Sequence, residues 1–155
     1  KTLAFLIDQL RPIIAAEYRI DPKQQILFGH STAAALVTQA LLTKPYAFSH
    51  YIISSPTLNI SEYHIFTMEE QYAAKHKDMP AQVFFSAAEQ EAQQVGDIPV
   101  AAFGLVSSTA RMVERLSLRQ YSSLEINFRI FPDETHATVS QRSLKTALQT
   151  FWAES

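Results

Sequence analysis

The strongest constraint on the fold is an alternation between short apolar runs and longer segments with helical spacing. Four runs have the length and composition of buried strands: residues 25–28, 50–54, 82–86 and 125–131. Each run is followed by sequence that favours a helix, such as the alanine-rich stretch after the first. Strand followed by helix, four times over, predicts βαβ crossovers and a mainly parallel sheet covered by helices on both faces. The expected fold class is therefore α/β.

The segments around these runs predict the helices. The chain opens with one, whose apolar spacing continues to about Tyr18, before the Asp21-Pro22 turn. Further helices are expected at residues 32–42, 62–77 and 106–118. A C-terminal helix is expected to have an inner stripe made by Leu144, Ala147, Leu148 and Phe151. Residues 89–96 are polar and predict an exposed excursion after the third strand.

Composition excludes several classes of protein. The chain has 155 residues, of which 47% are hydrophobic and 18% charged, so one globular domain is expected rather than disorder or coiled coil. A net charge of -2 with scattered Lys and Arg predicts neither a nucleic acid nor a membrane surface as partner. No apolar run approaches the ~18 residues of a membrane span. The absence of cysteine removes disulfides, thiolate catalysis and cysteine-bound metals.

The sequence around residue 31 is the first candidate for chemistry. In parallel sheets ligands gather at the carboxyl ends of the strands, and Gly29-His30-Ser31-Thr32-Ala33 lies there, between the first strand and its helix. A serine on such a turn exposes its hydroxyl, and the helix N-terminus behind it offers unpaired N–H groups. The turn requires small residues two before and two after the serine, and Gly29 and Ala33 occupy those places. The alternative is that Ser31 only caps the helix.

The second candidate is a histidine just past the end of the fourth strand. Residues 131–136 (FPDETH) place His136 on a loop about 105 residues after Ser31. Serine, acid and histidine in this chain order are typical of an α/β-hydrolase triad, in which His136 acts as general base. The alternative is a histidine on a surface loop. No pair of histidines has the spacing of metal ligands and no Gly-rich phosphate loop occurs, so we expect no metal, no cofactor and no nucleotide.

With these residues the chain resembles the Putative esterase family of α/β-hydrolases, which includes the ferric-enterobactin and salmochelin esterases. The resemblance spans nearly the whole chain. It is carried by FLIDQLRPIIAAEYRIDPKQQILFGHS, by SSPTL after the second strand and by FRIFPDETHATV. It implies an α/β-hydrolase fold in which residues 1–155 form a single domain lacking its N-terminal strands. It also implies Ser31 as nucleophile, His136 as base and the backbone N–H of Thr32 as an oxyanion-hole donor.

The acid of the triad has two candidates. In the family that it resembles, the acid follows the third strand in a G-x-x-Asp/Glu pattern, and residues 88–91 (AEQE) occupy that place with Ala instead of Gly. Glu91 matches the last position of the pattern, and Glu89 is the alternative. A third interpretation is that both carboxylates are solvated in a polar loop.

These observations predict a serine hydrolase that cleaves carboxylic esters through an acyl-enzyme. The expected partner is a small-molecule ester, with a siderophore-type ester as the more specific candidate. The alternative is a catalytically silent α/β-hydrolase-like domain with a binding or structural role. A cytoplasmic location is expected, with the periplasm as the alternative, because the charged N-terminal segment is unlike a secretory signal. The sequence does not indicate the oligomeric state.

Overall fold

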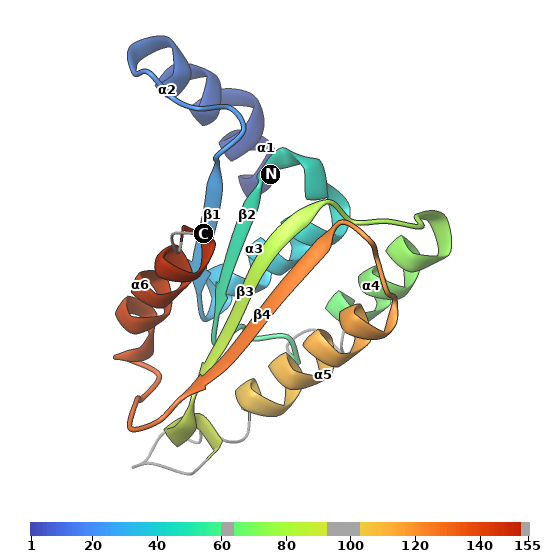
Figure 1. The fold of residues 1–155 in the computed structure, drawn as a ribbon, viewed down its shortest axis with the longest axis vertical. Helices are drawn as coiled ribbons and strands as arrows, with labels where there is room; N and C mark the ends of the chain where they lie inside the picture. The colour runs from blue at the N-terminus through green and yellow to red at the C-terminus, as the bar shows by residue number, and fades with distance from the viewer. Residues whose placement is uncertain (60–63, 93–102, 153–155) are drawn as a thin grey trace.

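A parallel sheet forms the centre of the molecule. The computed structural model describes residues 1–59, 64–92 and 103–152. In these residues the sheet has four strands that lie side by side in chain order (Figure 1): β1 (Ile26–His30), β2 (His50–Ser54), β3 (Ala81–Ala88) and β4 (Leu124–Phe131). All three neighbouring pairs are parallel. The predicted parallel sheet is confirmed, and the ends of each predicted strand lie within two residues of the observed ones.

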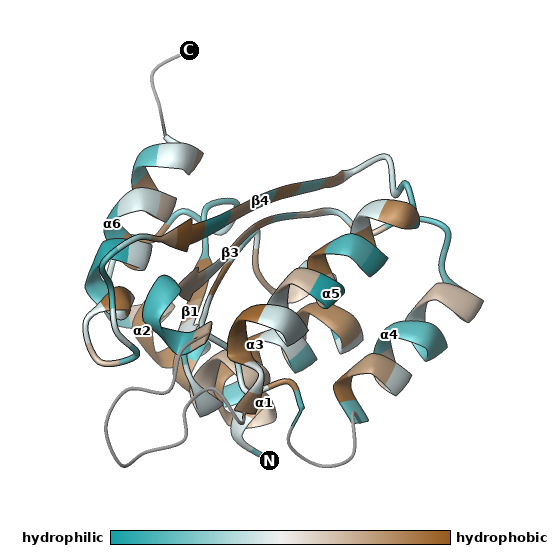
Figure 2. Ribbon diagram, turned by 90° about the horizontal axis from the view of Figure 1, so that it is seen from below, coloured by the Kyte–Doolittle hydropathy of each residue, from teal (hydrophilic) through white to brown (hydrophobic). Residues whose placement is uncertain are grey.

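Helices cover both faces of the sheet. The crossover helices are α3 (Thr32–Thr43), α4 (His64–Lys75) and α5 (Leu105–Leu118), and they lie on one face, whereas α6 (Val139–Phe151) packs on the other (Figures 1 and 2). Because the strands advance in one direction, right-handed crossovers bring all three connecting helices to the same side. Residues 62 and 63 of the predicted 62–77 helix lie outside the described residues.

The N-terminal helix consists of three consecutive pieces: α1 (Thr2–Phe5), the π-helical turn η1 (Leu6–Leu10) and α2 (Arg11–Glu17). Pro12 has no N–H to donate, and the wide turn comes directly before it, with the Arg11 N–H bonded to the Leu6 carbonyl. The helix ends at Tyr18, whose backbone is extended, as predicted. In Figure 1, α2 lies beyond the amino-terminal end of β1. No helix in the described ranges has the length and apolar character needed to cross a membrane.

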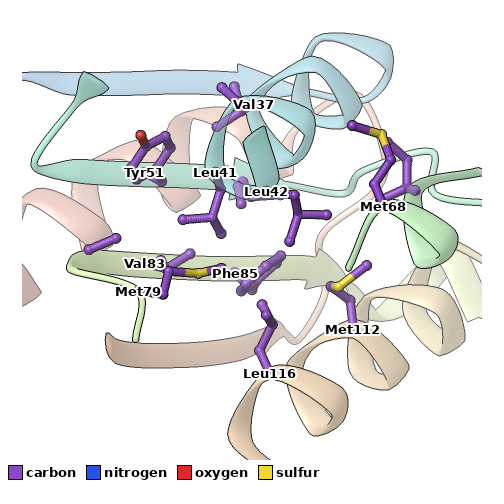
Figure 3. Close-up of a cluster of buried hydrophobic side chains, with 14 of the residues drawn as sticks. Val37, Leu41, Leu42, Tyr51, Met68, Met79, Val83, Phe85, Met112 and Leu116 are labelled. Atoms are coloured by element: carbon purple, nitrogen blue, oxygen red, sulfur yellow. The ribbon is translucent and has the colours of Figure 1, made fainter. Parts of the chain in front are cut away.

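Two hydrophobic clusters hold the layers together. The larger lies under α3, α4 and α5 and includes the side chains of Leu41, Phe85 and Met112 (Figure 3). The smaller lies under α6 and contains Ile52 and Phe84 from the central strands. All five residues of β2 are buried, as expected for a strand with helices on both faces. The apolar side of α5 faces the sheet and its charged side faces solvent (Figure 2).

The expected stripe of α6 is confirmed at Ala147, which is buried, and at Leu144 and Phe151, which pack against the smaller cluster. Leu148 is the exception and is 37% exposed. The buried positions Val139, Ser143 and Ala147 are spaced by four residues, as on a helical face. The Ser143 hydroxyl is buried 2.6 Å from the Ser86 hydroxyl of β3. Because a serine occupies this buried position, apolar periodicity does not predict its burial.

The register of the sheet aligns the loops at the carboxyl ends. His30 of β1 is level with Ser54 of β2, and Ser54 is level with Ser86 of β3. Strands β3 and β4 continue together to Ala88 and Phe131. The loops that leave β1, β2, β3 and β4 therefore begin at one edge of the sheet, at the bottom of Figure 1. Two short 3-10 turns complete the fold: η2 (Pro45–Ala47) and η3 (Glu89–Ala92).

Candidate active site

Ser31 occupies a strained turn between β1 and α3. Its backbone has φ 58° and ψ -122°, outside the regions that residues other than glycine favour. The surrounding hydrogen bonds hold it there: the Ser31 N–H donates to the Ser54 carbonyl at 2.9 Å, and the Ser31 carbonyl accepts from the Ala34 N–H at 3.0 Å. This is the geometry of a nucleophile elbow, which presents a serine hydroxyl at the carboxyl edge of the sheet.

Gly29 makes the sharp turn possible. A Cβ at this position would lie 2.5 Å from the carbonyl oxygen of Ala33 and 2.7 Å from the Cγ2 of Val37, closer than atoms can pack. The tight approach between β1 and α3 therefore runs through Gly29 and the backbone of Ala33. Ala33, the second of the two small residues that the turn requires, is itself exposed, so its methyl lies outside this contact.

The Ser31 hydroxyl does not cap the helix. Ser31 is the residue before α3, but its side chain makes no capping hydrogen bond. Its Oγ instead lies 2.9 Å from Nε2 of His136, which comes from the loop after β4. The capping interpretation of Ser31 is thus wrong for this structure, and two residues 105 positions apart meet as predicted.

The tautomer of His136 follows from its second partner. The Nδ1 atom lies 2.6 Å from Oε1 of Glu91. Because an ionised carboxylate can only accept, Nδ1 carries the proton and donates it to Glu91. The lone pair of Nε2 then faces the hydroxyl of Ser31. This is the arrangement in which an imidazole can take a proton from a serine.

Glu91 is buried, contrary to the expectation of an exposed polar segment. Its side chain has no exposed area, and Oε2 accepts two hydrogen bonds, from the Ser55 hydroxyl at 3.0 Å and from the Ala88 N–H at 2.9 Å. The cause is the length of β3, which continues to Ala88 and leads into η3, whose turn directs Glu91 inward. Residues 93–96 of the predicted excursion lie outside the described residues.

Glu89 has a different role. It is exposed, and its Oε2 accepts the backbone N–H of Asp133 at 3.1 Å. The neighbouring Gln90 N–H donates to the Glu134 carbonyl at 3.2 Å. These two bonds join η3 to the loop that carries His136. Of the two carboxylates considered from the sequence, the structure therefore brings Glu91 to the histidine and uses Glu89 to anchor the histidine loop.

The histidine loop is also fixed from the α6 side. The Thr138 hydroxyl donates to Glu134, and Arg142 pairs with the same carboxylate at 3.2 Å. These contacts hold the pKa of Glu134 below its usual value, the Thr138 hydrogen bond being the larger cause. Arg142 also donates to the Pro132 carbonyl at 3.2 Å. The backbone on both sides of His136 is thereby tied to neighbouring elements.

Ser55 is a site residue that the sequence reasoning did not single out. It follows β2 directly, has a φ of 46°, and is fully buried where its hydroxyl reaches Glu91. The available signal was its place in the SSPTL run, at a strand end on the same edge as Ser31. A hydroxyl after a strand is so common that the position alone does not predict a partner.

Thr32 begins α3, where the first N–H groups have no acceptor within the helix. Beside it lies a hollow of about 270 Å³ between the start of α3 and the start of α4. Its walls are mostly apolar and are formed by Thr32, Ala35, Leu36, Gln39, Thr57, His64 and Ile65. Among the described residues, no group of three or more His, Asp or Glu side chains is placed to hold a metal ion.

Comparison with known proteins decides the family. A family model described as "Putative esterase" matches residues 1–148, nearly the whole chain. The chain belongs to the Putative esterase family. Its fold is that of the α/β-hydrolases, as predicted, since solved α/β serine hydrolases superpose on it over almost its full length.

Several relatives of this esterase domain carry siderophore esterase names. Ferri-bacillibactin esterase BesA of Bacillus subtilis is 29% identical over 147 residues, which are 94% of this chain and 48% of that protein. The crystal structure of BES protein from Bacillus cereus matches with 25% identity and a TM-score of 0.79, covering 95% of this chain and 52% of the other. Siderophore hydrolase EstA from Aspergillus nidulans matches with 21% identity and a TM-score of 0.80, covering 96% and 55%. The chain thus spans about half the length of these relatives.

Proposed function

We propose that Ser31, His136 and Glu91 form a catalytic triad that hydrolyses carboxylic esters through an acyl-enzyme. One observation carries the proposal: an unbroken hydrogen-bond chain runs from the Ser31 Oγ through both nitrogens of His136 to a carboxylate that is fully buried. Burial keeps water from competing for the carboxylate, and the two further donors on Glu91 fix its orientation.

The geometry supports a two-step reaction. In the first step His136 Nε2 takes the proton of the Ser31 hydroxyl while Oγ attacks the ester carbonyl, and the same proton then passes to the leaving alcohol. In the second step water gives a proton to Nε2 and attacks the acyl-enzyme; the bond to Ser31 Oγ then breaks, Nε2 returns the proton to Oγ, and the acid is released. Glu91 holds the Nδ1 proton throughout and stabilises the imidazolium that forms in each step.

We propose that the oxyanion hole has two N–H donors, which come from two regions of the domain. We propose the backbone N–H of Thr32 as one donor, because it lies next to Ser31 at the N-terminus of α3. The α/β-hydrolase pattern takes a second donor from a loop that precedes the nucleophile elbow. Because the chain spans about half the length of its relatives, we propose that further strands of the domain supply this donor and lie along the free edge of β1.

The names of the relatives and the lining of the hollow beside Thr32 both bear on the substrate class. The printed names of the relatives favour a siderophore-type ester. An anionic iron chelate would favour a cationic pocket, whereas the described residues that line the hollow beside Thr32 present mostly apolar groups and include no Arg or Lys. We therefore propose a small-molecule carboxylic ester as substrate, with its acyl part in this hollow, and a siderophore ester as the narrower candidate.

The test compares variants of the intact protein on an activated short-chain ester such as p-nitrophenyl butyrate. Ser31→Ala is expected to reduce kcat by at least roughly 10⁴-fold, because the nucleophile is lost. Ser107→Ala, on the exposed side of α5, is the matched control and should retain the activity of the unmodified protein. Turnover of Ser31→Ala at the control rate would overturn the proposal.

A fluorophosphonate probe separates an enzyme from a catalytically silent domain. The probe reacts with a serine only when a base activates it. We expect mass spectrometry to find the label on Ser31 in the unmodified protein and to find none in His136→Ala. An unlabelled Ser31 in the folded, intact protein would favour the silent binding or structural domain.

A further inference from the structure

A second histidine is packed on the imidazole of His136. His30 is the last residue of β1 and directly precedes Ser31. Its ring lies against that of His136, with a distance of 4.6 Å between the ring centroids and an angle of 38° between the planes. On its other side the Nδ1 of His30 lies 3.2 Å from the hydroxyl of Ser54, a fully buried residue at the end of β2. His30 thus connects the histidine loop to the ends of β1 and β2.

The plane of the His136 ring is set by rotation about its Cβ–Cγ bond. Glu91 holds Nδ1 and Ser31 contacts Nε2, and turning the ring about this bond carries both nitrogens away from these partners. A ring packed against the imidazole opposes that rotation. Among the described residues, His30 provides an aromatic contact of this kind.

We propose that His30 is a positioning residue, whose aromatic face holds the plane of the His136 imidazole in line with the Ser31 hydroxyl. The proposal rests on the triad function proposed above. The stack uses the ring of His30, whereas the hydrogen bond to Ser54 uses its Nδ1 and holds His30 itself in place. The two contacts therefore have different consequences, and substitutions can separate them.

The charge state of His30 is compatible with this role. Burial is the main cause that lowers its pKa, and the positive charge of a protonated His136 lowers it further. The Glu91 carboxylate and hydrogen bonds to the backbone of His136 and Ser54 act in the opposite direction with smaller effect. A neutral His30 can lie against His136 without repelling the imidazolium that forms when the serine proton is taken.

The experiment measures kcat and KM for three variants of the intact protein at residue 30. His30→Ala removes both contacts and is expected to lower kcat roughly ten- to hundredfold with little change in KM, because a misaligned base slows only the chemical step. His30→Gln retains a polar group for Ser54 but has no ring, so it should lower kcat similarly. His30→Phe retains the ring but loses the hydrogen bonds to Ser54 and to the backbone of His136, so it should restore kcat and lower the unfolding midpoint in urea.

The opposite pattern would overturn the proposal. If His30 only stabilises the fold, His30→Gln would retain kcat and His30→Phe would lose it together with stability. His76→Ala is the matched control, because His76 directly follows α4, is exposed and packs on Tyr72 with ring centroids 4.3 Å apart; its kcat should equal that of the unmodified protein. Ser31→Ala in the same assay distinguishes the two proposals. If it is inactive while His30→Ala and His30→Gln retain full kcat, only the positioning role fails; if it is active, the triad function fails.

Discussion

Two regions of the molecule differ in how completely their side chains are partnered. At the carboxyl edge of the sheet, Ser31, His136 and Glu91 come from three separate loops, and each has its hydrogen-bond partner within the chain. At the other region, formed by the N-terminal helix and the free edge of β1, large apolar residues are exposed, with Ile13 at 55%, Tyr18 at 63% and Phe28 at 37%. Ile7 is the buried residue of the helix pieces α1, η1 and α2.

The difference separates the proposed triad from the exposed apolar side of the domain. The three triad residues follow β1, β3 and β4, and β2 supports them through Ser54 and Ser55; all of these lie within the described residues. Between the N-terminal helix and β1 lies a groove whose lining includes Leu10, Ile14 and Leu27. Apolar surface that gathers in this way usually marks a place that another part of a protein covers. This agrees with a chain that spans about half the length of its relatives.

The largest expected effect separates the two carboxylates of η3. Glu91→Gln should lower kcat/KM by roughly 10²–10⁴-fold, because an amide no longer fixes the Nδ1 proton of His136 or stabilises the imidazolium. Glu89→Gln removes the same charge two residues away but retains an oxygen for the Asp133 N–H, so its kcat/KM should stay within about twofold of the unmodified protein. Steady-state kinetics on an activated ester measures both. Equal losses in the two variants would contradict the assignment of Glu91.

The next effect concerns the turn under Ser31. Gly29→Ala should lower the free energy of unfolding by about 1–3 kcal/mol, because the new methyl overlaps the Ala33 carbonyl. Urea denaturation followed by circular dichroism measures the change. Adding Val37→Ala removes the contact with the Val37 side chain but not the one with the Ala33 backbone, so the double variant should be no more stable than Gly29→Ala. Rescue by Val37→Ala would mean that the side chain, and not the turn, sets the requirement for glycine.

Much of this site could be predicted from the sequence, because two of its reactive side chains lie close to the ends of strands. Ser31 directly follows β1 and His136 lies on the short loop after β4, so the periodicity that locates the strands also locates these residues. The choice between Glu89 and Glu91 is different, since both lie in one short turn and the sequence does not show which of them the turn directs inward. That direction depends on β3 continuing to Ala88, two residues beyond its predicted end.

Residues that act through polar contacts were the hardest to predict. Ser143 lies in the buried stripe of α6, where an apolar residue is expected, and only its pairing with Ser86 explains its burial. The Ser55 hydroxyl bonds to Glu91, and the ring of His30 packs on that of His136. In both cases the partner is distant in the sequence. Apolar spacing carries no signal for such contacts, because each depends on the register between strands and not on a repeat along the chain.

A smaller effect is expected for the dependence of stability on pH. Burial lowers the pKa of both His30 and His50 in the folded chain from the ordinary value of 6.5. The unfolded chain then binds more protons, so the free energy of unfolding should fall as the pH drops below about 6.5 toward the lowered folded values. His50 packs against Phe151 and Trp152 at the amino end of β2, the opposite end of the strand from Ser54 and Ser55. His50→Gln should therefore flatten this pH dependence in urea denaturation without changing kcat; an unchanged slope would contradict it.

The smallest effect tests the exposed region itself. Ile13→Ser replaces an exposed apolar residue on α2 and should change the free energy of unfolding of residues 1–155 by less than about 0.5 kcal/mol, because nothing is removed from a core. Ile53→Val removes a single methylene from the fully buried strand β2 and should cost more, about 0.5–1.5 kcal/mol. If the face around Ile13 is covered by further strands in the intact protein, Ile13→Ser should cost more there than in residues 1–155. An equal, small effect in both proteins would show that this face stays open to solvent, and would remove the link between the apolar surface and the rest of the domain.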